Sequence, residues 1–252
     1  MHEVEEVFAR LDTLVGGPAR TNAQIRRDYH GSTIPHLGLT LPTQRQALKQ
    51  GYSFSHLPAK QQVKRWDRVW RDAKWFETMS QSAIWLSALR DTADLLACWP
   101  TAKGWITRCD NWAHSDLLSS AYSRMLEADN DRSKVYPTLT KWNASKNPWH
   151  RRQSIVSLIY YHSPNRTPPK PREVLPLVET LLHDDDVYVQ KGVGWTLRES
   201  YNAFPKQAGP FIDKHATALS SIAYSAATEK HPKAHKEQLK AKRKAARQAA
   251  RK

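Results

Sequence analysis

Helical segments with an aromatic residue at their start recur along the chain at a nearly constant interval. The intervals are 37, 37 and 39 residues, between segments that begin at Trp75, Trp112, Trp149 and Tyr188. A second aromatic residue follows ten positions later in the first two, at Trp85 and Tyr122, and Ile159 lies beside Tyr160 in the third. This period is typical of stacked helix pairs that bury one another's apolar faces. With ten Trp in the chain, a chance alignment of four helices is the alternative.

Proline positions agree with a chain built from helices. Pro42, Pro58 and Pro148 each stand where a helix is predicted to begin, since proline suits the first helical turn. A proline-rich loop is expected over residues 162–171, followed by a helix from Glu173 to His183. No convincing set of alternating strands is present, so we predict an all-α superhelix of antiparallel pairs. The aromatic residue that starts each segment could line its inner curve or fill the layer beneath.

Size, cysteine count and hydropathy narrow the class of protein. The 252 residues are enough for a sizeable core. The only cysteines, Cys98 and Cys109, do not form a CxxC pair, which fits a reducing, cytoplasmic compartment better than a disulfide framework. The first ten residues do not resemble a secretory signal, and no apolar run approaches the roughly 20 residues of a membrane span.

The formal net charge of +15 is concentrated at the C-terminus. The last 23 residues contain ten Lys or Arg and one Glu, so they account for +9 and the rest of the chain for +6. A basic tail alone is often only a solvated extension. A body that stays basic while containing ten Trp indicates a polyanionic partner more firmly.

Common catalytic and cofactor signatures are missing. The sequence has no GxGxxG, GxxxxGK[ST], HExxH or GxSxG motif, and Gly192-Val193-Gly194 is too short for a phosphate loop. Several histidines do not pair at metal-ligand spacing with Cys or acidic residues, namely His30, His36, His56, His114, His150 and His162. We therefore expect neither a metal nor a nucleotide cofactor.

One carboxylate stands among aromatic and amide residues in the segment 109–116. Trp112 and Asp116 are four positions apart, so a helix would place them side by side. The simpler reading is that Ser115 or Asp116 caps a helix while Trp112 packs in the core. Trp195 could likewise pack against a closely approaching helix. Arg151 and Arg152 could belong to a solvated face with incidental ion pairs.

These segments resemble the bacterial HEAT-like-repeat DNA alkylation repair glycosylases of the alkylpurine DNA glycosylase D type. The resemblance covers most of residues 29–200. Its motifs are Tyr29, His36-Leu37-Gly38-Leu39 before Leu41-Pro42-Thr43-Gln44-Arg45, Asn111-Trp112 to Asp116, Trp149-His150-Arg151-Arg152, and the run from Val189 to Glu199. The last run is the most specific, whereas the proline-rich loop and the tail depart from the family.

The resemblance implies an all-α, HEAT-like (ARM-like) superhelix with a concave basic DNA-binding face. It implies a monomeric, cofactor-free glycosylase that releases cationic N3- and N7-alkylated purines from duplex DNA in the bacterial cytoplasm, associated with the nucleoid. Asp116 then corresponds to the catalytic carboxylate, and Trp112 and Trp195 to its aromatic walls. Arg152, with Arg151 as the alternative, corresponds to the arginine at the lesion. Tyr29 and Lys191 would also contact DNA.

The residue types suit that chemistry. Alkylation at N3 or N7 makes the base a cationic leaving group, so the remaining barrier is the positive charge that grows on the sugar. A carboxylate near C1′ stabilises this charge or orients water, and such electrostatic effects contribute roughly 3–4 kcal/mol per group. Aromatic walls attract cations by about 0.5–2 kcal/mol each.

Two other classes of function remain open from the sequence. A non-catalytic relative could bind damaged or branched DNA, and helical repeats also serve as protein-binding scaffolds. We expect residues 1–229 to form the repeat domain. Residues 230–252 are expected to form a basic tail that is disordered or a frayed helix, because it has no apolar stripe to bury.

Overall fold

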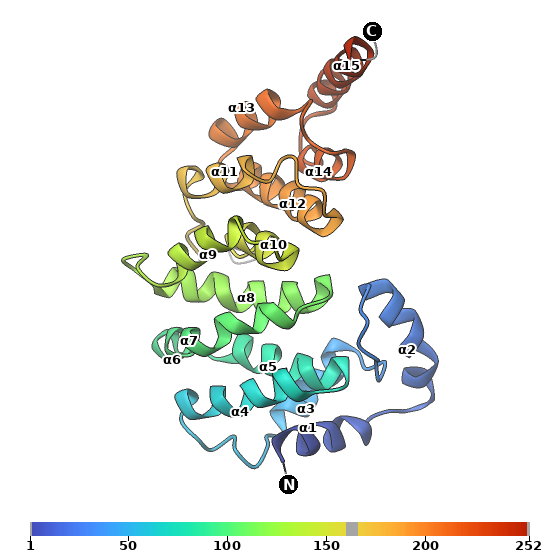
Figure 1. Ribbon diagram of the computed structural model, residues 1–252, viewed down its shortest axis with the longest axis vertical. Helices are drawn as coiled ribbons and strands as arrows, with labels where there is room; N and C mark the ends of the chain where they lie inside the picture. The colour runs from blue at the N-terminus through green and yellow to red at the C-terminus, as the bar shows by residue number, and fades with distance from the viewer. Residues whose placement is uncertain (1, 160–165, 251–252) are drawn as a thin grey trace. The chain divides into compact units, whose positions relative to one another are not determined.

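The computed structural model describes residues 2–159 and 166–250, and every regular element within these ranges is a helix (Figure 1). The all-α prediction is thus confirmed. None of the described helices is long and apolar enough to cross a membrane. The helices group into two compact units, residues 1–135 and 136–252.

The first unit is a stack of helix pairs. Helix α1 packs on α4, α4 on α5, and α5 on α8, while α3 packs on α5 and α6 on α8. The bounds are α1 Glu3–Asp12, α2 Gly17–His30, α3 Leu41–Lys49, α4 Ala59–Asp72, α5 Phe76–Ala88, α6 Thr92–Ala97, α7 Trp99–Ala102, the 3₁₀ helix η1 Lys103–Arg108 and α8 Trp112–Ala128.

The second unit contains the remaining helices. Helix α12 is at its centre and contacts α10, α11, α13 and α14. The bounds are α9 Val135–Asn143, whose first residue belongs to the first unit, α10 Pro148–Val156, α11 Pro171–Glu179, α12 Val187–Ala203, α13 Pro205–His215, α14 Ser221–Ala227 and α15 Lys233–Ala249.

The predicted helix starts agree with the structure. Pro42 and Pro148 lie in the first turns of α3 and α10, and Pro58 is the N-cap of α4. The four recurring aromatic residues also stand at helix starts, and all four are partly exposed: Trp75, Trp112, Trp149 and Tyr188. The residues ten positions later, Trp85 and Tyr122, are buried, and so is Ile159, while Tyr160 lies outside the described residues. The repeat therefore has a buried apolar position and a partly exposed aromatic one.

Tryptophan also forms the centre of the first unit. Trp66, Trp70 and Trp105 are almost fully buried, and the last two stack with ring centroids 5.4 Å apart. The Trp70 indole N–H donates to the Trp105 carbonyl at 2.8 Å, and the Trp105 indole N–H donates to Asp67 Oδ1 at 2.9 Å. The indole donors of Trp70 and Trp105 are thus satisfied, whereas the buried indole N–H of Trp66 has no hydrogen-bond partner among the described residues.

Two boundaries differ from the sequence prediction. The helix expected over Glu173–His183 begins at Pro171, because Glu173 accepts a hydrogen bond from the Lys170 backbone N–H and so caps the first turn. It ends as a regular helix at Glu179, where a turn continues to residue 183. Residues 160–165 lie outside the described residues. They include Pro164 and the first part of the expected proline-rich loop.

Most of the basic tail forms a helix in the structure. Residues 233–249 form α15, whose Leu239 and Arg243 are buried. The Arg243 guanidinium donates to the carbonyls of Ala216 and Leu219 and lies 4.3 Å from the Tyr224 ring centroid. A single leucine and an arginine stem thus supply the packed side that the sequence pattern did not reveal.

Glycine permits a close helix contact in the second unit. A Cβ atom on Gly194 of α12 would lie 2.7 Å from the Ala223 carbonyl oxygen and 2.8 Å from the Ala226 Cβ, both on α14. Gly104, in η1, has open space where a Cβ would be. The sequence Gly192-Val193-Gly194 is therefore a packing motif.

We expect Gly194→Ala to destabilise the protein by about 1–3 kcal/mol, because the added methyl group has to push α14 away from α12. Gly104→Ala is the matched control. It should leave stability unchanged or raise it by up to about 1 kcal/mol. Urea unfolding followed by circular dichroism measures both, and equal stability of the two variants would contradict the close contact.

Candidate functional site

Asp116 lies at the start of α8, on the same side of the helix as Trp112. Asn111 caps this helix through its side-chain oxygen, which accepts the His114 backbone N–H at 2.8 Å. Trp112 is the first helical residue and Asp116 follows one turn later, both partly exposed. The cap belongs to Asn111, which leaves Asp116 and Trp112 side by side at the edge of a cleft.

The cleft has a volume of about 620 Å³ and lies wholly within the first unit. Its walls come from α2, α3, α5, α8 and the residues next to them. Four cationic side chains line it, together with three aromatic rings and two carboxylates: Arg26, Arg45, Lys49 and Arg90; His30, Phe76 and Trp112; Glu77 and Asp116. A concave surface with this set of charges favours an anionic ligand.

The two carboxylates of the cleft have different environments. Glu77 is 1% exposed and accepts the backbone N–H groups of Leu37, Gly38 and Leu39 at 2.7, 2.8 and 3.1 Å. Burial raises the pKa of Glu77 against the opposing effect of these bonds. Glu77 therefore holds the chain segment before α3, and Asp116 is the partly exposed carboxylate of the lining.

Trp112 is fixed by the end of α2. Its indole N–H donates to the Tyr29 carbonyl oxygen at 3.0 Å, and its ring meets those of Tyr29 and His30 edge to face at 5.2 and 5.3 Å. Tyr29 itself is 70% exposed. The structure thus brings together three of the residues singled out in the sequence, Tyr29, Trp112 and Asp116, within one unit.

Behind Trp112 lies a stack of rings made by three histidines and Phe76. The Phe76 ring centroid is 4.1 Å from those of His36 and His114 and 4.8 Å from that of His30. Burial lowers the pKa of His36 to about 4 and that of His114 to about 3. Burial and the nearby Arg26 also lower the pKa of His30. Uncharged imidazoles can pack on Phe76 as flat apolar surfaces, so the stack acts as a rigid wall.

The second unit contains the other predicted residues. Arg152 on α10 is only 2% exposed, and its guanidinium donates to the Tyr188 carbonyl oxygen at 2.7 Å. The same group lies 5.6 Å from the ring centroid of Trp195 on α12. Arg152 therefore supports Trp195, which is partly exposed.

Arg151 and Lys191 have contrasting positions in this unit. The Arg151 guanidinium makes two hydrogen bonds to the Asp184 carboxylate and one to each of the Ser145 and Lys146 carbonyl oxygens. The hydrogen bond to Asp184 raises the pKa of Arg151. Lys191 is exposed, with its Nζ 4.9 Å from the Tyr188 ring centroid. Of these predicted DNA-binding cations, Lys191 is the exposed one.

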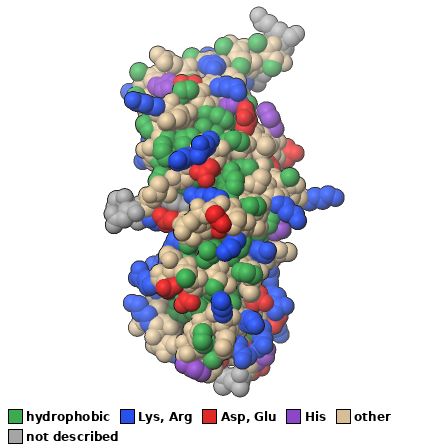
Figure 2. All heavy atoms as spheres, turned by 90° about the vertical axis from the view of Figure 1, so that its left-hand side faces the viewer, with side chains coloured by type: hydrophobic (Ala, Val, Ile, Leu, Met, Phe, Trp, Pro, Cys, Tyr) green, Lys and Arg blue, Asp and Glu red, His purple; other side chains and the backbone are tan. Residues whose placement is uncertain are grey.

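Other cations of the cleft lay outside the sequence prediction. Three of them lie outside the sequence motifs: Arg26 on α2, Lys49 at the end of α3 and Arg90 after α5. Arg45 is the last residue of the motif that begins at Leu41. On the face drawn in Figure 2, basic, acidic and apolar side chains are interspersed in both units. Charge clustering along the sequence would not have found the cleft.

No group of three His, Cys, Asp or Glu side chains that could hold a metal ion forms in the cleft, as far as the described residues extend. The group of this kind that does form, Asp213, His231 and His235, lies in the second unit.

Comparison with known proteins gives a consistent family and fold. A family model described as "DNA alkylation repair enzyme" matches residues 15–231. The crystal structure of AlkD2 from Streptococcus mutans aligns with a TM-score of 0.53 and 18% identity over 82% of this chain and 96% of that one. The structure of smu.31 from Streptococcus mutans UA159 gives 0.55 and 18% over 85% and 99%. At this identity the structures show a shared helical-repeat fold. No curated protein matches the sequence.

The histidine stack predicts acid sensitivity. The unfolded chain binds a proton on both His36 and His114 below about pH 6.5, whereas the folded protein does so only near their lowered pKa values of about 4 and 3. Stability should therefore fall as the pH drops from about 6.5 to 4, by up to about 1.4 kcal/mol per pH unit for each histidine.

We expect His36→Phe to lower the number of protons taken up on unfolding by about one between pH 7 and 5. The phenyl ring can stack on Phe76 as the imidazole does, but it does not titrate. Urea unfolding at half-unit pH steps measures the slope. The exposed His56 provides the control, His56→Phe, which should keep the parent slope. A parent slope in His36→Phe would show that His36 is protonated in the folded state.

Proposed function

Because the chain belongs to the DNA alkylation repair enzyme family, we propose that it is a DNA glycosylase acting on cationic N3- and N7-alkylated purines in duplex DNA. The observation that carries the proposal is the partly exposed Asp116, next to the fixed ring of Trp112 in a cleft lined by four cationic side chains. The protein would act as a cytoplasmic monomer, and the reaction itself would need neither a metal nor a nucleotide cofactor.

The proposed reaction is hydrolysis of the bond between C1′ and the alkylated base. The base leaves with the bonding electrons and becomes neutral, so no general acid is needed. The sugar gains the positive charge, and a water oxygen bonds to C1′ as its proton passes to Asp116 or to solvent. The Asp116 carboxylate stabilises the sugar cation most strongly when its charge is greatest, which lowers the barrier by roughly 3–4 kcal/mol.

Binding would divide between aromatic surfaces and cations. Trp112 attracts the cationic base through its ring, by about 0.5–2 kcal/mol, and its bond to the Tyr29 carbonyl keeps the ring in place. In the second unit, Trp195 offers a similar surface supported by Arg152. Tyr29, Lys191 and the cations of the cleft contact the DNA, the cations through its phosphates.

A non-catalytic DNA-binding protein is the second candidate. The cationic lining of the cleft serves phosphate binding in either case, and fold alone does not decide activity. The two candidates differ in their need for Asp116. A carboxylate does not help to bind phosphate, so a protein that only binds DNA has no use for it, whereas a glycosylase needs it for the reaction.

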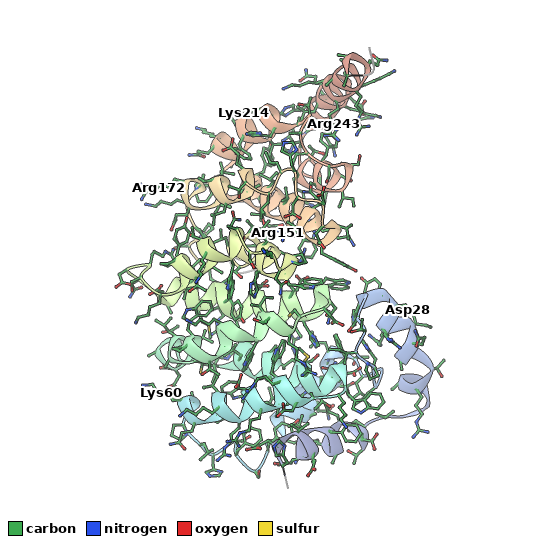
Figure 3. The ribbon with its side chains drawn as sticks, in the orientation of Figure 1. Asp28, Lys60, Arg151, Arg172, Lys214 and Arg243 are labelled. Carbon is green, nitrogen blue, oxygen red and sulfur yellow. The ribbon has the colours of Figure 1, made fainter. Side chains whose placement is uncertain are left out.

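Asp116→Asn should lower the single-turnover release of N7-methylguanine from methylated duplex DNA by at least about 100-fold, because the amide has no charge to stabilise the sugar cation. Duplex affinity should change by no more than about threefold, since the charge matters mainly in the transition state. Asp28→Asn is the matched control: it removes the same charge from an exposed site on α2 outside the cleft (Figure 3).

The Asp28 control should keep full activity. Release by Asp116→Asn at the parent rate would remove Asp116 from the reaction. Absence of release by the parent protein, with duplex affinity intact, would favour the binding protein.

Arg45→Gln tests the phosphate contact of the cleft. Loss of one contact should reduce the slope of log K against log salt concentration by about 0.9, measured by fluorescence anisotropy with duplex DNA. Lys60→Gln on α4, exposed and outside the cleft (Figure 3), should leave the slope unchanged. If both variants give the parent slope, the cleft does not bind the DNA backbone.

A further inference from the structure

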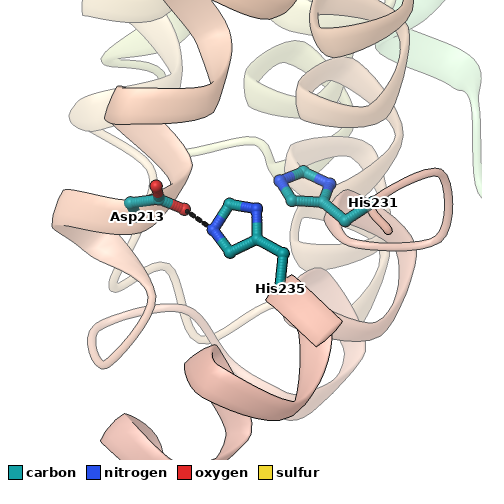
Figure 4. Close-up of side chains that lie close together, drawn as sticks. All are labelled: Asp213, His231 and His235. Atoms are coloured by element: carbon teal, nitrogen blue, oxygen red, sulfur yellow. Dashed lines mark ion pairs between the residues drawn. The ribbon is translucent and has the colours of Figure 1, made fainter. Parts of the chain in front are cut away.

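Three potential metal ligands converge where α13 meets the start of α15 (Figure 4). Asp213 comes from α13, His231 from the turn before α15, and His235 from the first turn of α15. One ligand atom of each side chain lies within 4.8 Å of the others. Asp213 Oδ1 and His235 Nε2 are already an ion pair at 2.9 Å. Two imidazoles and a carboxylate therefore face a common point.

His231 is the unusual member of the group. The residue is only 4% exposed, and neither nitrogen of its ring has a hydrogen-bond partner among the described residues. Buried polar groups are nearly always partnered, because an unpaired one loses its hydration without compensation. The Tyr201 ring stacks on His231 at a centroid distance of 4.0 Å and so fixes the imidazole plane. A metal ion would supply the missing partner.

The charges near His231 act in opposite directions on a divalent ion. The cationic Lys236 opposes binding of a divalent ion, whereas the carboxylate of Asp213 offsets it.

We propose that Asp213, His231 and His235 form a zinc-binding site, with water as the fourth ligand. Imidazole nitrogen and carboxylate oxygen are ligands that zinc accepts in tetrahedral sites, and three protein ligands with one open position are common. Such a site needs ligand atoms about 3.3 Å apart, as follows from zinc bonds of about 2.0 Å. The observed ligand atoms, all within 4.8 Å of one another, would have to move to this separation as zinc binds.

The site would join the basic helix α15 to α13. Asp213 is on one helix and His235 on the other, and Leu239 and Arg243 already pack α15 against this unit. Zinc would therefore fix the start of a helix with many cationic side chains. This inference does not depend on the proposed glycosylase activity, because none of its three residues belongs to the cleft.

The test uses the full chain without a histidine tag, stripped with EDTA and transferred to metal-free neutral buffer. Calorimetric titration with ZnCl₂ should give saturable binding at one zinc per chain, and MgCl₂ should give none because Mg²⁺ prefers oxygen ligands. Zinc should also raise the melting temperature, because it binds the folded chain. No saturable binding of zinc, or equal binding of magnesium, would overturn the proposal.

His235→Asn is the decisive variant, because this side chain is partly exposed and its loss leaves the packing of His231 on Tyr201 in place. We expect zinc affinity to fall by at least about 10-fold, with the parent circular dichroism spectrum retained. His56→Asn, at an exposed position in the first unit, should bind like the parent. Parent affinity in His235→Asn would exclude His235 as a ligand and overturn the site.

Cobalt(II) gives a second readout that needs no variant. The stripped parent protein loaded with CoCl₂ should show the strong visible bands of a tetrahedral ion, and zinc should remove them by displacement. Weak octahedral bands alone would overturn the three-ligand site even if a variant failed to fold.

Discussion

The cleft of the first unit depends on two carboxylates, the buried Glu77 and the partly exposed Asp110, that hold one stretch of extended chain. Glu77 accepts three backbone N–H groups from residues 37–39, and Asp110 accepts the backbone N–H and the hydroxyl of Thr33, each at 2.7 Å. Burial opposes ionisation of Asp110, but its hydrogen bonds, from Asn111 and Thr33 above all, outweigh this and lower its pKa. Charged acceptors make strong hydrogen bonds. They anchor residues 32–39 to α5 and to the start of α8, and thereby fix the end of α2.

Glycine completes this anchor. Gly38 has a φ of +82°, and a Cβ there would lie 2.0 Å from the Ala19 carbonyl oxygen of α2. The chain can thus pass close under α2, which places the Tyr29 carbonyl where the Trp112 indole donates to it. The position of the Trp112 ring next to Asp116 follows from contacts between residues that are 40 to 83 positions apart in the sequence. Changes at residues 32–39 would therefore reach the cleft without touching its lining.

Local signals account for what the sequence predicted. Helix period, proline at helix starts and a 37-residue aromatic interval are local patterns, so the all-α stack and most helix starts could be predicted. Trp112 and Asp116 could be paired because both belong to one helix. The cations of the cleft come from α2, α3 and the chain after α5, with no shared motif. The group of Asp213, His231 and His235 joins α13 to the start of α15 and the turn before it. Only tertiary packing brings these residues together, and periodicity does not encode it.

The net charge of the chain does not indicate which cationic side chains are available to a ligand. The Arg108 guanidinium donates to the carbonyls of Trp70 and Ala73 at the end of α4, and Arg124 donates to those of Ser87 and Leu89 at the end of α5. Arg243 does the same for the residues after α13. The last carbonyls of a helix lack intrahelical partners, and a cation near them is favourable.

Arginine side chains from later segments therefore cap the C-terminal ends of earlier helices in the repeat. The formal charge of +15 includes these capping arginines, and Arg152 under Trp195 is a further arginine used within the protein. The electrostatic attraction available to DNA comes from a smaller, exposed set such as Arg45 and Lys191. The affinity of such a chain for a polyanion therefore depends on how many guanidinium groups are exposed, rather than on the total count of basic residues.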